Sequence, residues 1–306
     1  MPRNPAPTVV AFSALPVEFD LNQTYRAHPT PLSLDSMREI MRTIRFARGL
    51  FAIASASLAL WSLAYAETAL QSVPSWLGWR EAWVYATALV VLAASAGLCF
   101  PRTALPSLVT IGAYEGLSAA ISLPDFMSKP LTVGDWYPFF EALTPFSAAW
   151  VLYAILRRQS QKSPSLVAGE RAVRAAQALF GLTCVFYGWS HFAYADYTAS
   201  MVPAWLPGHL ALAYFTGLGH CAAGLALIAG LLPRLAATLE ATMMSLFGLL
   251  VWVPSFFTQP RPQWATPPEN QWLELATNLV LAASAWVIAI FLGNRPWTLR
   301  PTARQQ

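Results

Sequence analysis

Two histidines in the second half of the chain stand inside long apolar runs. They are His191 and His220. A charge at the centre of a bilayer costs at least ~2.5 kcal/mol on insertion scales, so ionisable groups at such positions face a cavity or a partner. A neutral imidazole can exchange hydrogen bonds and take up a proton near neutral pH. We therefore treat both as candidate catalytic residues. The alternative is that each only satisfies a hydrogen bond within the helix packing.

Further polar residues fall near the same predicted end of the membrane. Asp196, His209 and Glu274 stand at the ends of apolar runs, and Asn278 lies one turn beyond Glu274 on the same helix face. A pocket that opens to the outer face and binds a ligand would use these four residues. We expect it to be fenced by Trp189, Trp205 and Trp272. The alternative for Glu274 is a carboxylate that favours the positive end of its helix.

These residues do not predict a metal or haem site. His191 and His220 differ by about six residues of depth, or ~9 Å at the rise of an α-helix, which disfavours two axial ligands on one haem. Asp196, His209 and Glu274 add ligand types that suit zinc or copper. Their spacing matches no recognised metal motif, so we assign no metal.

The elements that carry these side chains are eight apolar segments. Hydrophobic residues make up 56% of the 306 and charged residues only 11%, whereas soluble domains carry about 25% charge. Each segment is about 20 residues long, enough to cross the hydrocarbon layer as a helix. The segments are 46–68, 82–100, 103–123, 137–156, 174–195, 209–231, 235–257 and 271–292. The sequence thus predicts an all-α membrane protein with eight transmembrane helices.

The basic residues predict the orientation of these helices. If the N-terminus is cytoplasmic, all 19 Lys and Arg except Arg80, Lys129 and Arg261 fall on the cytoplasmic side, as the positive-inside rule requires. The C-terminus is then cytoplasmic as well. The net charge of +4 comes mostly from this collar, so the expected partner is membrane lipid and not nucleic acid.

The two halves of the chain repeat each other at a common offset of 129 residues. Val73-Pro74-Ser75-Trp76-Leu77 matches Val202-Pro203-Ala204-Trp205-Leu206, and Tyr65 matches Tyr194. This predicts two tandem four-helix bundles related by an axis along the membrane normal. The expected domains are a Pro-rich cytoplasmic tail with a basic amphipathic segment (1–45), a first repeat (46–157), a basic linker (158–173), a second repeat (174–293) and a C-terminal tail (294–306).

The first copy lacks the histidines of the second. At the same offset the mates of His191 and His220 are Ser62 and Val91, which predicts one working copy and one scaffolding copy. Glu67 and Glu115 of the first copy are expected in structural or coupling roles. Glu115 lies mid-segment and needs a partner, for which we consider His220. Glu240 is explained by its place near the start of a helix.

Several motifs of the second copy form a recognisable set. They are Gly188-Trp189-Ser190-His191-Phe192, Val202-Pro203-Ala204-Trp205-Leu206-Pro207, Thr216-Gly217-Leu218-Gly219-His220-Cys221, Pro233-Arg234-Leu235-Ala236-Ala237 and Asn278-Leu279. With them, residues 174–292 resemble the DoxX-like family of small four-helix membrane proteins. The resemblance implies a subunit of a redox system in a bacterial inner membrane, as in thiosulfate:quinone oxidoreductases. Where that family often has an acidic residue after its Thr-Gly pair, this chain has His220.

Three functions follow as hypotheses. In the first, the protein is a redox-linked membrane subunit that binds quinone or a similar amphipathic molecule and works with a soluble or membrane redox partner. The aromatic walls and neutral imidazoles suit a quinone head group. In the second, it is a non-enzymatic membrane anchor that docks another protein on its basic cytoplasmic segments. In the third, it is a small-molecule transporter, since duplicated bundles are common there.

Overall fold

The computed structural model describes residues 34–129, 132–160, 167–265 and 267–298. The chain divides into two compact units, residues 1–41 and 42–306. The second unit holds every helix below except the first turns of α1. The predicted Pro-rich tail and most of the C-terminal tail lie outside the described residues, as does 161–166 of the basic linker.

Eight long helices account for the eight apolar segments. They are α1 (Leu34–Ala64), α3 (Arg80–Gly97), α4 (Ala104–Ser128), α5 (Tyr137–Ser160), α6 (Glu170–Ala193), α8 (His209–Ala229), α9 (Pro233–Phe247) and α11 (Pro268–Phe291). The described residues contain no strand. The all-helical fold is therefore confirmed. One difference is that α1 runs without a break from Leu34, so the basic segment up to residue 45 and the first span form a single helix.

Six of these helical stretches are long and apolar enough to cross a membrane. They lie within α1, α4, α5, α8, α9 with its continuation to Ser255, and α11. The other two long helices, α3 and α6, open with charged residues: α3 with Arg80 and Glu81, α6 with Glu170 and Arg171. The structure thus supports an integral membrane protein with six candidate spans among its described helices.

Short elements join the long helices. They are α2 (Ala66–Ala69), α7 (Ala195–Met201), α10 (Val253–Ser255), a π-helical turn η3 (Gly248–Trp252) and three 3₁₀ turns, η1 (Leu70–Ser72), η2 (Val133–Trp136) and η4 (Gln263–Ala265). The π-helical turn ends two residues before Pro254. Because proline lacks an N–H and crowds the carbonyl four residues earlier, it accounts for the local change of helix geometry.

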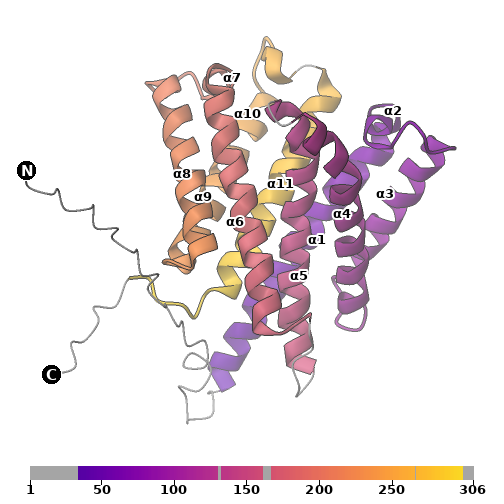
Figure 1. The fold of residues 1–306 in the computed structure, drawn as a ribbon, viewed down its shortest axis with the longest axis vertical. Coiled ribbons are helices and arrows are strands. Elements are labelled where there is room, and N and C mark those ends of the chain that lie inside the picture. Colours follow the sequence, from indigo (N-terminus) through magenta and orange to yellow (C-terminus); the bar gives the residue numbers. More distant parts are fainter. Residues whose placement is uncertain (1–33, 130–131, 161–166, 266, 299–306) are drawn as a thin grey trace, which may run out of the picture. The chain divides into compact units, whose positions relative to one another are not determined.

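The long helices of residues 42–306 run alternately up and down, with α5 and α11 packed against each other (Figure 1). α5 also packs on α4 and α6, and α11 on α9. Trp61 of α1 donates a hydrogen bond of 2.8 Å to the carbonyl oxygen of Glu269 at the start of α11. The main apolar core joins both halves and includes Phe51, Leu152, Phe180 and Ile288. The halves therefore share one core.

Glycines hold α6 and α8 at close range. A Cβ atom on Gly188 would lie 2.6 Å from the carbonyl oxygen of Gly217, and one on Gly181 would lie 2.8 Å from that of Gly224. Small residues at such contacts let two membrane helices approach backbone to backbone. The glycines of α8 therefore allow close packing on α6.

Two backbone features recur at matched places in the halves. Tyr65 (φ −125°, ψ 50°) and Tyr194 (φ −121°, ψ 41°) each separate a long helix from the short helix that follows. Trp79 (φ 54°) and Gly208 (φ 68°) each precede a long helix in the left-handed conformation. Both pairs are separated by the offset found in the sequence.

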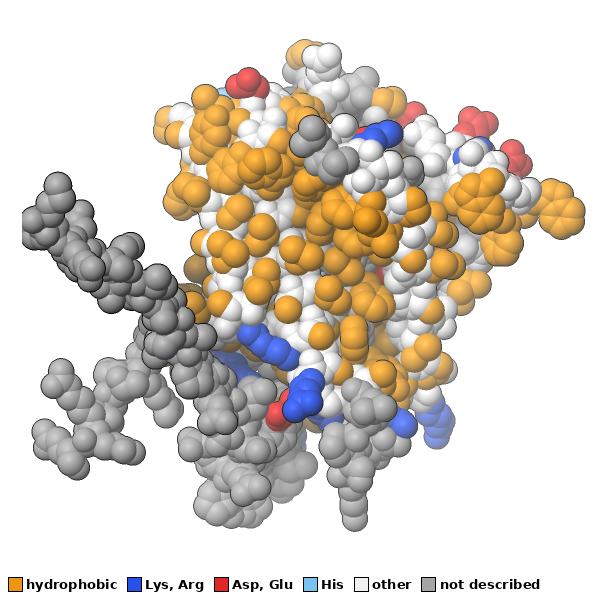
Figure 2. Space-filling model, in the orientation of Figure 1, with side chains coloured by type: hydrophobic (Ala, Val, Ile, Leu, Met, Phe, Trp, Pro, Cys, Tyr) orange, Lys and Arg blue, Asp and Glu red, His pale blue; other side chains and the backbone are white. Residues whose placement is uncertain are grey.

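Basic side chains gather at one end of the helices. Figure 2 shows Lys and Arg mostly at the lower end, below a wide apolar surface. This end carries the loop 98–103 and the turn 230–232, together with Arg102, Arg158, Arg171, Arg234 and Arg295. Of the described basic residues, Arg80, Lys129 and Arg261 lie at the opposite helix ends.

Candidate functional site

A cavity of about 1340 Å³ lies mainly among the helices of the second half. Its lining comes from α5, α6, α7, α8, α9, the π-helical turn and α11. Most of the wall is apolar, with Phe215, Leu239 and Phe247 among its residues. The polar groups on the wall are few, which is the usual composition of a site for an amphipathic small molecule.

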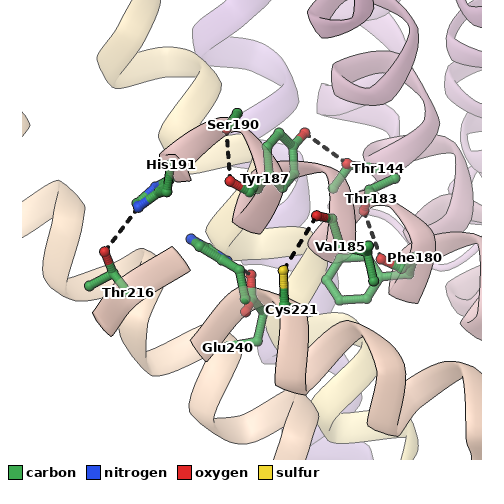
Figure 3. Close-up of polar contacts among 11 residues, drawn as sticks. Thr144, Phe180, Thr183, Val185, Tyr187, Ser190, His191, Thr216, Cys221 and Glu240 are labelled. Carbon is green, nitrogen blue, oxygen red and sulfur yellow. Dashed lines mark hydrogen bonds and ion pairs between the residues drawn. The ribbon is translucent and has the colours of Figure 1, made fainter. Parts of the chain in front are cut away.

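His191 lies on the cavity wall near the end of α6 (Figure 3). Its Nδ1 atom is 2.9 Å from the hydroxyl oxygen of Thr216 and 3.3 Å from the carbonyl oxygen of Ala213, both on α8. The close packing of α6 on α8 makes this contact available, because a Cβ atom on Gly217 would come within 2.9 Å of the Cβ atom of His191. The ring is therefore fixed in place from one side.

His220 and Glu240 form a buried pair on the same cavity wall. The Nδ1 atom of His220, on α8, lies 2.8 Å from Oε1 of Glu240, on α9. The residues are 1% and 2% exposed. The second carboxyl oxygen of Glu240 is buried without a hydrogen-bond partner among the described residues. Such a pair is costly to break, since the group left behind would be buried alone.

The partner of His220 is thus not the one considered from the sequence. Glu115 is buried in α4, and α4 contributes no described residue to the cavity lining. Glu240, and not Glu115, is the carboxyl partner of His220. The explanation of Glu240 as a carboxylate favoured by a helix start is also wrong, because it lies two turns inside α9 and binds an imidazole.

The two imidazoles are close to each other despite their different depths. Their ring centroids are 5.1 Å apart, and Phe247 lies 6.0 Å from His191 and 5.9 Å from His220. The separation of ~9 Å estimated from helix rise considered only the position of each residue along its helix. Side chains that converge on one cavity shorten this separation.

The upper part of the cavity holds two carboxyl groups from different halves. Glu141 of α5 and Glu274 of α11 both line it, with Tyr137 beside them. Asn278 lines the cavity one turn below Glu274, and its Oδ1 has no partner among the described residues. The first half of the chain therefore supplies part of the wall.

Tyr197 of α7 lies beside the mouth of this region and outside the long helices. Burial raises the pKa of its hydroxyl group, and the nearby Glu274 carboxyl group raises it further. The phenol therefore stays protonated at neutral pH and can donate a hydrogen bond at the cavity mouth.

The remaining predicted site residues lie outside the cavity lining. The three tryptophans expected to fence the pocket are exposed, and none of them lines it: they are Trp189, Trp205 and Trp272. Asp196 is exposed on α7, and His209 is half-buried at the first position of α8. Glu67 is exposed on α2. The cavity instead has Tyr137, Tyr187 and Trp252 among its aromatic residues.

No group of three or more His, Cys, Asp or Glu residues that could hold a metal ion occurs among the residues that the structure describes. His191 and His220 converge, but Asp196 and His209 do not line the cavity with them. The arrangement can donate, accept and exchange protons with a bound polar group, through two imidazoles and the carboxyl groups of Glu141, Glu240 and Glu274.

Glu240 and Glu141 were missed as site residues, although a signal for the first was present. Helices α8 and α9 are joined by a short turn at 230–232. His220 and Glu240 lie at similar distances from that turn, and residues placed so in a helical hairpin have similar depth in the membrane. Two ionisable residues at one depth on adjacent helices are candidates for a pair. Glu141 also lies inside an apolar segment, 137–156, but its partner Glu274 belongs to the other half, so local spacing does not pair the two.

Comparison with known proteins gave one match. The DoxX family model matches residues 174–253. These residues contain α6 to α9, and with them His191, His220 and Glu240. No curated protein and no solved structure matches the chain. The matched segment contains all but Asn278-Leu279 of the motifs that carry the resemblance, and it supports the interpretation of the protein as a DoxX-like membrane protein.

Proposed function

We propose that this protein is a subunit of a redox system in a bacterial inner membrane and works with a redox partner protein. In this proposal its cavity binds quinone or a similar amphipathic molecule. The observation that carries the proposal is the convergence of His191, His220 and Glu240 on one large apolar cavity. Quinone chemistry requires proton exchange at a head group, and imidazole and carboxyl groups are the side chains that most often exchange protons in such sites.

The size and the rim of the cavity support a ligand with a long apolar tail. At about 1340 Å³ it is larger than the ~300–1,000 Å³ typical of small-molecule sites. Phe215, Leu239 and Leu246 line it and are also 70%, 59% and 45% exposed. In a membrane protein such side chains face lipid, so the cavity would open sideways into the hydrocarbon layer between α8 and α9.

Filling the cavity tests this proposal. Ala222 lines the cavity, whereas Leu225 on the same helix does not line it and is exposed. We expect Ala222→Trp to lower several-fold the quinone that co-purifies with the protein, because the indole would occupy the ligand's volume. Mass spectrometry of organic extracts measures this amount. Leu225→Trp is the matched control and should leave it unchanged.

If the unaltered protein and the Leu225→Trp control both carry no quinone after purification from quinone-containing membranes, the proposal is wrong. Co-purification of a stoichiometric protein without any small ligand would favour the membrane anchor. Uptake of a solute into proteoliposomes would favour the transporter.

We also propose eight spans with both termini in the cytoplasm. α6 packs along α8 through two glycine contacts, so it runs through the same layer as that candidate span. α3 has 18 residues, about 27 Å of helix, which is close to the ~30 Å thickness of the hydrocarbon layer. The basic residues at one end of the helices (Figure 2) support a cytoplasmic location of that end.

The tandem duplication is part of the same proposal. It is supported by the matched turns at Tyr65 and Tyr194 and the matched left-handed residues Trp79 and Gly208. A left-handed conformation is uncommon for a residue other than glycine. Trp79 is therefore unlikely to share this conformation with its mate Gly208 by chance. In this view the halves kept their backbone while their polar residues diverged.

A further inference from the structure

The hydrogen bonds of His191 determine which of its ring nitrogens carries the proton. Thr216 donates its only hydroxyl hydrogen to the backbone carbonyl oxygens of Leu212 (2.9 Å) or Ala213 (3.0 Å). When Thr216 donates to one of these carbonyls, its oxygen is left to accept from Nδ1 of His191. The second neighbour of Nδ1, the carbonyl oxygen of Ala213, can only accept. Nδ1 thus carries the hydrogen, and Nε2 of the neutral ring is a bare acceptor.

The pair of His220 and Glu240 has the opposite polarity. In an apolar membrane interior the pair is most stable with no net charge. Two arrangements meet this condition, an imidazolium with a carboxylate or an imidazole with a carboxylic acid. Because Nδ1 faces Oε1 at 2.8 Å and an acid proton on Oε2 would have no partner among the described residues, the shared proton lies between Nδ1 and Oε1, and Nε2 of His220 carries a hydrogen. It is therefore a donor.

Both Nε2 atoms are open to the cavity. Neither has a hydrogen-bond partner among the described residues, and neither is among the buried unpartnered atoms, although Glu240 Oε2 and Asn278 Oδ1 are. Both residues line the cavity, with ring centroids 5.1 Å apart. The cavity thus presents an acceptor and a donor side by side.

We infer that this site selects a head group with a hydroxyl over the same head group with a carbonyl, which for a quinone ligand means the quinol form. The inference rests on the proposed function. A hydroxyl group can donate to Nε2 of His191 while its oxygen accepts from Nε2 of His220. A carbonyl oxygen can accept from His220 but cannot donate, so the nitrogen of His191 would be desolvated without a partner.

The preference does not depend on the neutral state of the pair. If the pair loses its proton, Nε2 of His220 becomes a second acceptor, and a ligand that only accepts would bind neither imidazole. A hydroxyl group would still donate to one of them. As long as the ring of His191 is neutral, the site therefore selects the hydroxyl form whether or not the pair of His220 and Glu240 holds its shared proton.

The test is a binding comparison on the full chain, purified in nanodiscs. The probes are decylubiquinol and decylubiquinone, which differ only in hydroxyl against carbonyl groups, and calorimetry under anaerobic conditions measures both affinities. We expect the quinol to bind about tenfold more tightly, the effect of one hydrogen bond lost at a buried site. His191→Phe keeps a flat ring but removes the acceptor, so it should abolish most of this preference while the affinity for the quinone changes little.

A second variant keeps the test decisive if His191→Phe fails to fold. Thr216→Val leaves Nδ1 with only the longer contact to Ala213, so the ring is less firmly held and the preference should fall in part. Equal affinities, or tighter binding of the quinone, would overturn the inference while leaving the proposed function intact. An unchanged preference in a folded His191→Phe protein would also overturn it. If neither probe binds the unaltered protein, the proposed function itself fails.

Discussion

At the scale of single residues, the cavity is defined by two imidazoles in different surroundings. His191 bonds to a hydroxyl group and a backbone carbonyl, and His220 bonds to a carboxyl group. The first ring can exchange a proton only through Nε2, whereas the second can share a proton with Glu240. This difference between two chemically identical side chains comes entirely from their neighbours.

The buried pair should contribute to stability as a unit. His220→Phe would leave the carboxyl group of Glu240 buried alone and lower the free energy of unfolding by about 3–5 kcal/mol. Glu240→Leu would leave a buried imidazole nitrogen unpartnered, at a cost of about 1–3 kcal/mol. The double variant should lose clearly less than the sum of the two. Unfolding of the detergent-solubilised protein by denaturant measures all three values.

Glu81→Leu is the control for removing a carboxylate, because Glu81 is exposed on α3. It should change stability by less than about 0.5 kcal/mol. Additive losses in the double variant would mean that His220 and Glu240 do not interact in the protein.

At the scale of helices, the site depends on one tight and one open contact. α6 and α8 meet through Gly181, Gly188, Gly217 and Gly224, without side chains between the backbones. α8 and α9 instead enclose much of the cavity between them. Close packing on one side of α8 brings His191 to the wall, and the separation on the other side leaves room for a ligand.

Gly217→Ala should disturb both stability and the site. The added Cβ atom would lie 2.9 Å from the Cβ atom of His191, so α6 and α8 would have to separate. Overpacking of this kind costs about 1–3 kcal/mol. Thermal unfolding in detergent measures the loss, and the affinity for decylubiquinol measures the displacement of His191.

Gly49→Ala provides the matched control in α1, since a Cβ atom there meets nothing within 4 Å. Alanine is also the better helix former, so this variant should be as stable as the unaltered protein or more so. Equal behaviour of the two variants would show that the α6–α8 contact tolerates a methyl group.

At the scale of the whole molecule, the two halves complete one cavity. Phe140 of α5 stacks on Phe186 of α6 with ring centroids 4.3 Å apart, and the hydroxyl groups of Thr144 and Tyr187 are 3.1 Å apart. This contact places Glu141 of the first half in the wall that α11 closes from the second half. The second half alone would therefore lack the part of the wall that α5 supplies.

Eight spans and cytoplasmic termini predict a specific labelling pattern. In a chain with one cysteine at a time, a membrane-impermeant maleimide should label Ser75→Cys and Ala204→Cys in intact cells. The native Cys99 and Val167→Cys should react only after the membrane is permeabilised. All four positions are exposed. Ser75 and Cys99 lie on either side of α3, and Val167 and Ala204 lie on either side of α6.

The two pairs also test the two helices that are least apolar. If α3 does not cross, Ser75→Cys and Cys99 would be labelled from the same side. The same result for Ala204→Cys and Val167→Cys would show that α6 does not cross. A reversed pattern at all four positions would contradict the orientation deduced from the basic residues.

The sequence by itself determined the helices and the motifs that they carry. Apolar runs of about 20 residues have few alternatives in a membrane, and a long helix overlaps each of the eight. The DoxX-like motifs and the glycines of α8 were also evident, because they depend on residue type and local spacing alone. His191, His220, Glu274 and Asn278 stood out as polar residues in apolar segments, and all four line the cavity.

Only the tertiary structure decided which residues meet. It paired His220 with Glu240 and not Glu115, brought Glu141 from the first half, and left Trp189, Trp205 and Trp272 outside the cavity. The physical reason is that hydropathy records how deep a residue lies but not the direction in which its helix faces. That direction is set by packing between helices distant in sequence, here by the glycine contacts of α6 with α8 and the aromatic contacts of α5 with α6.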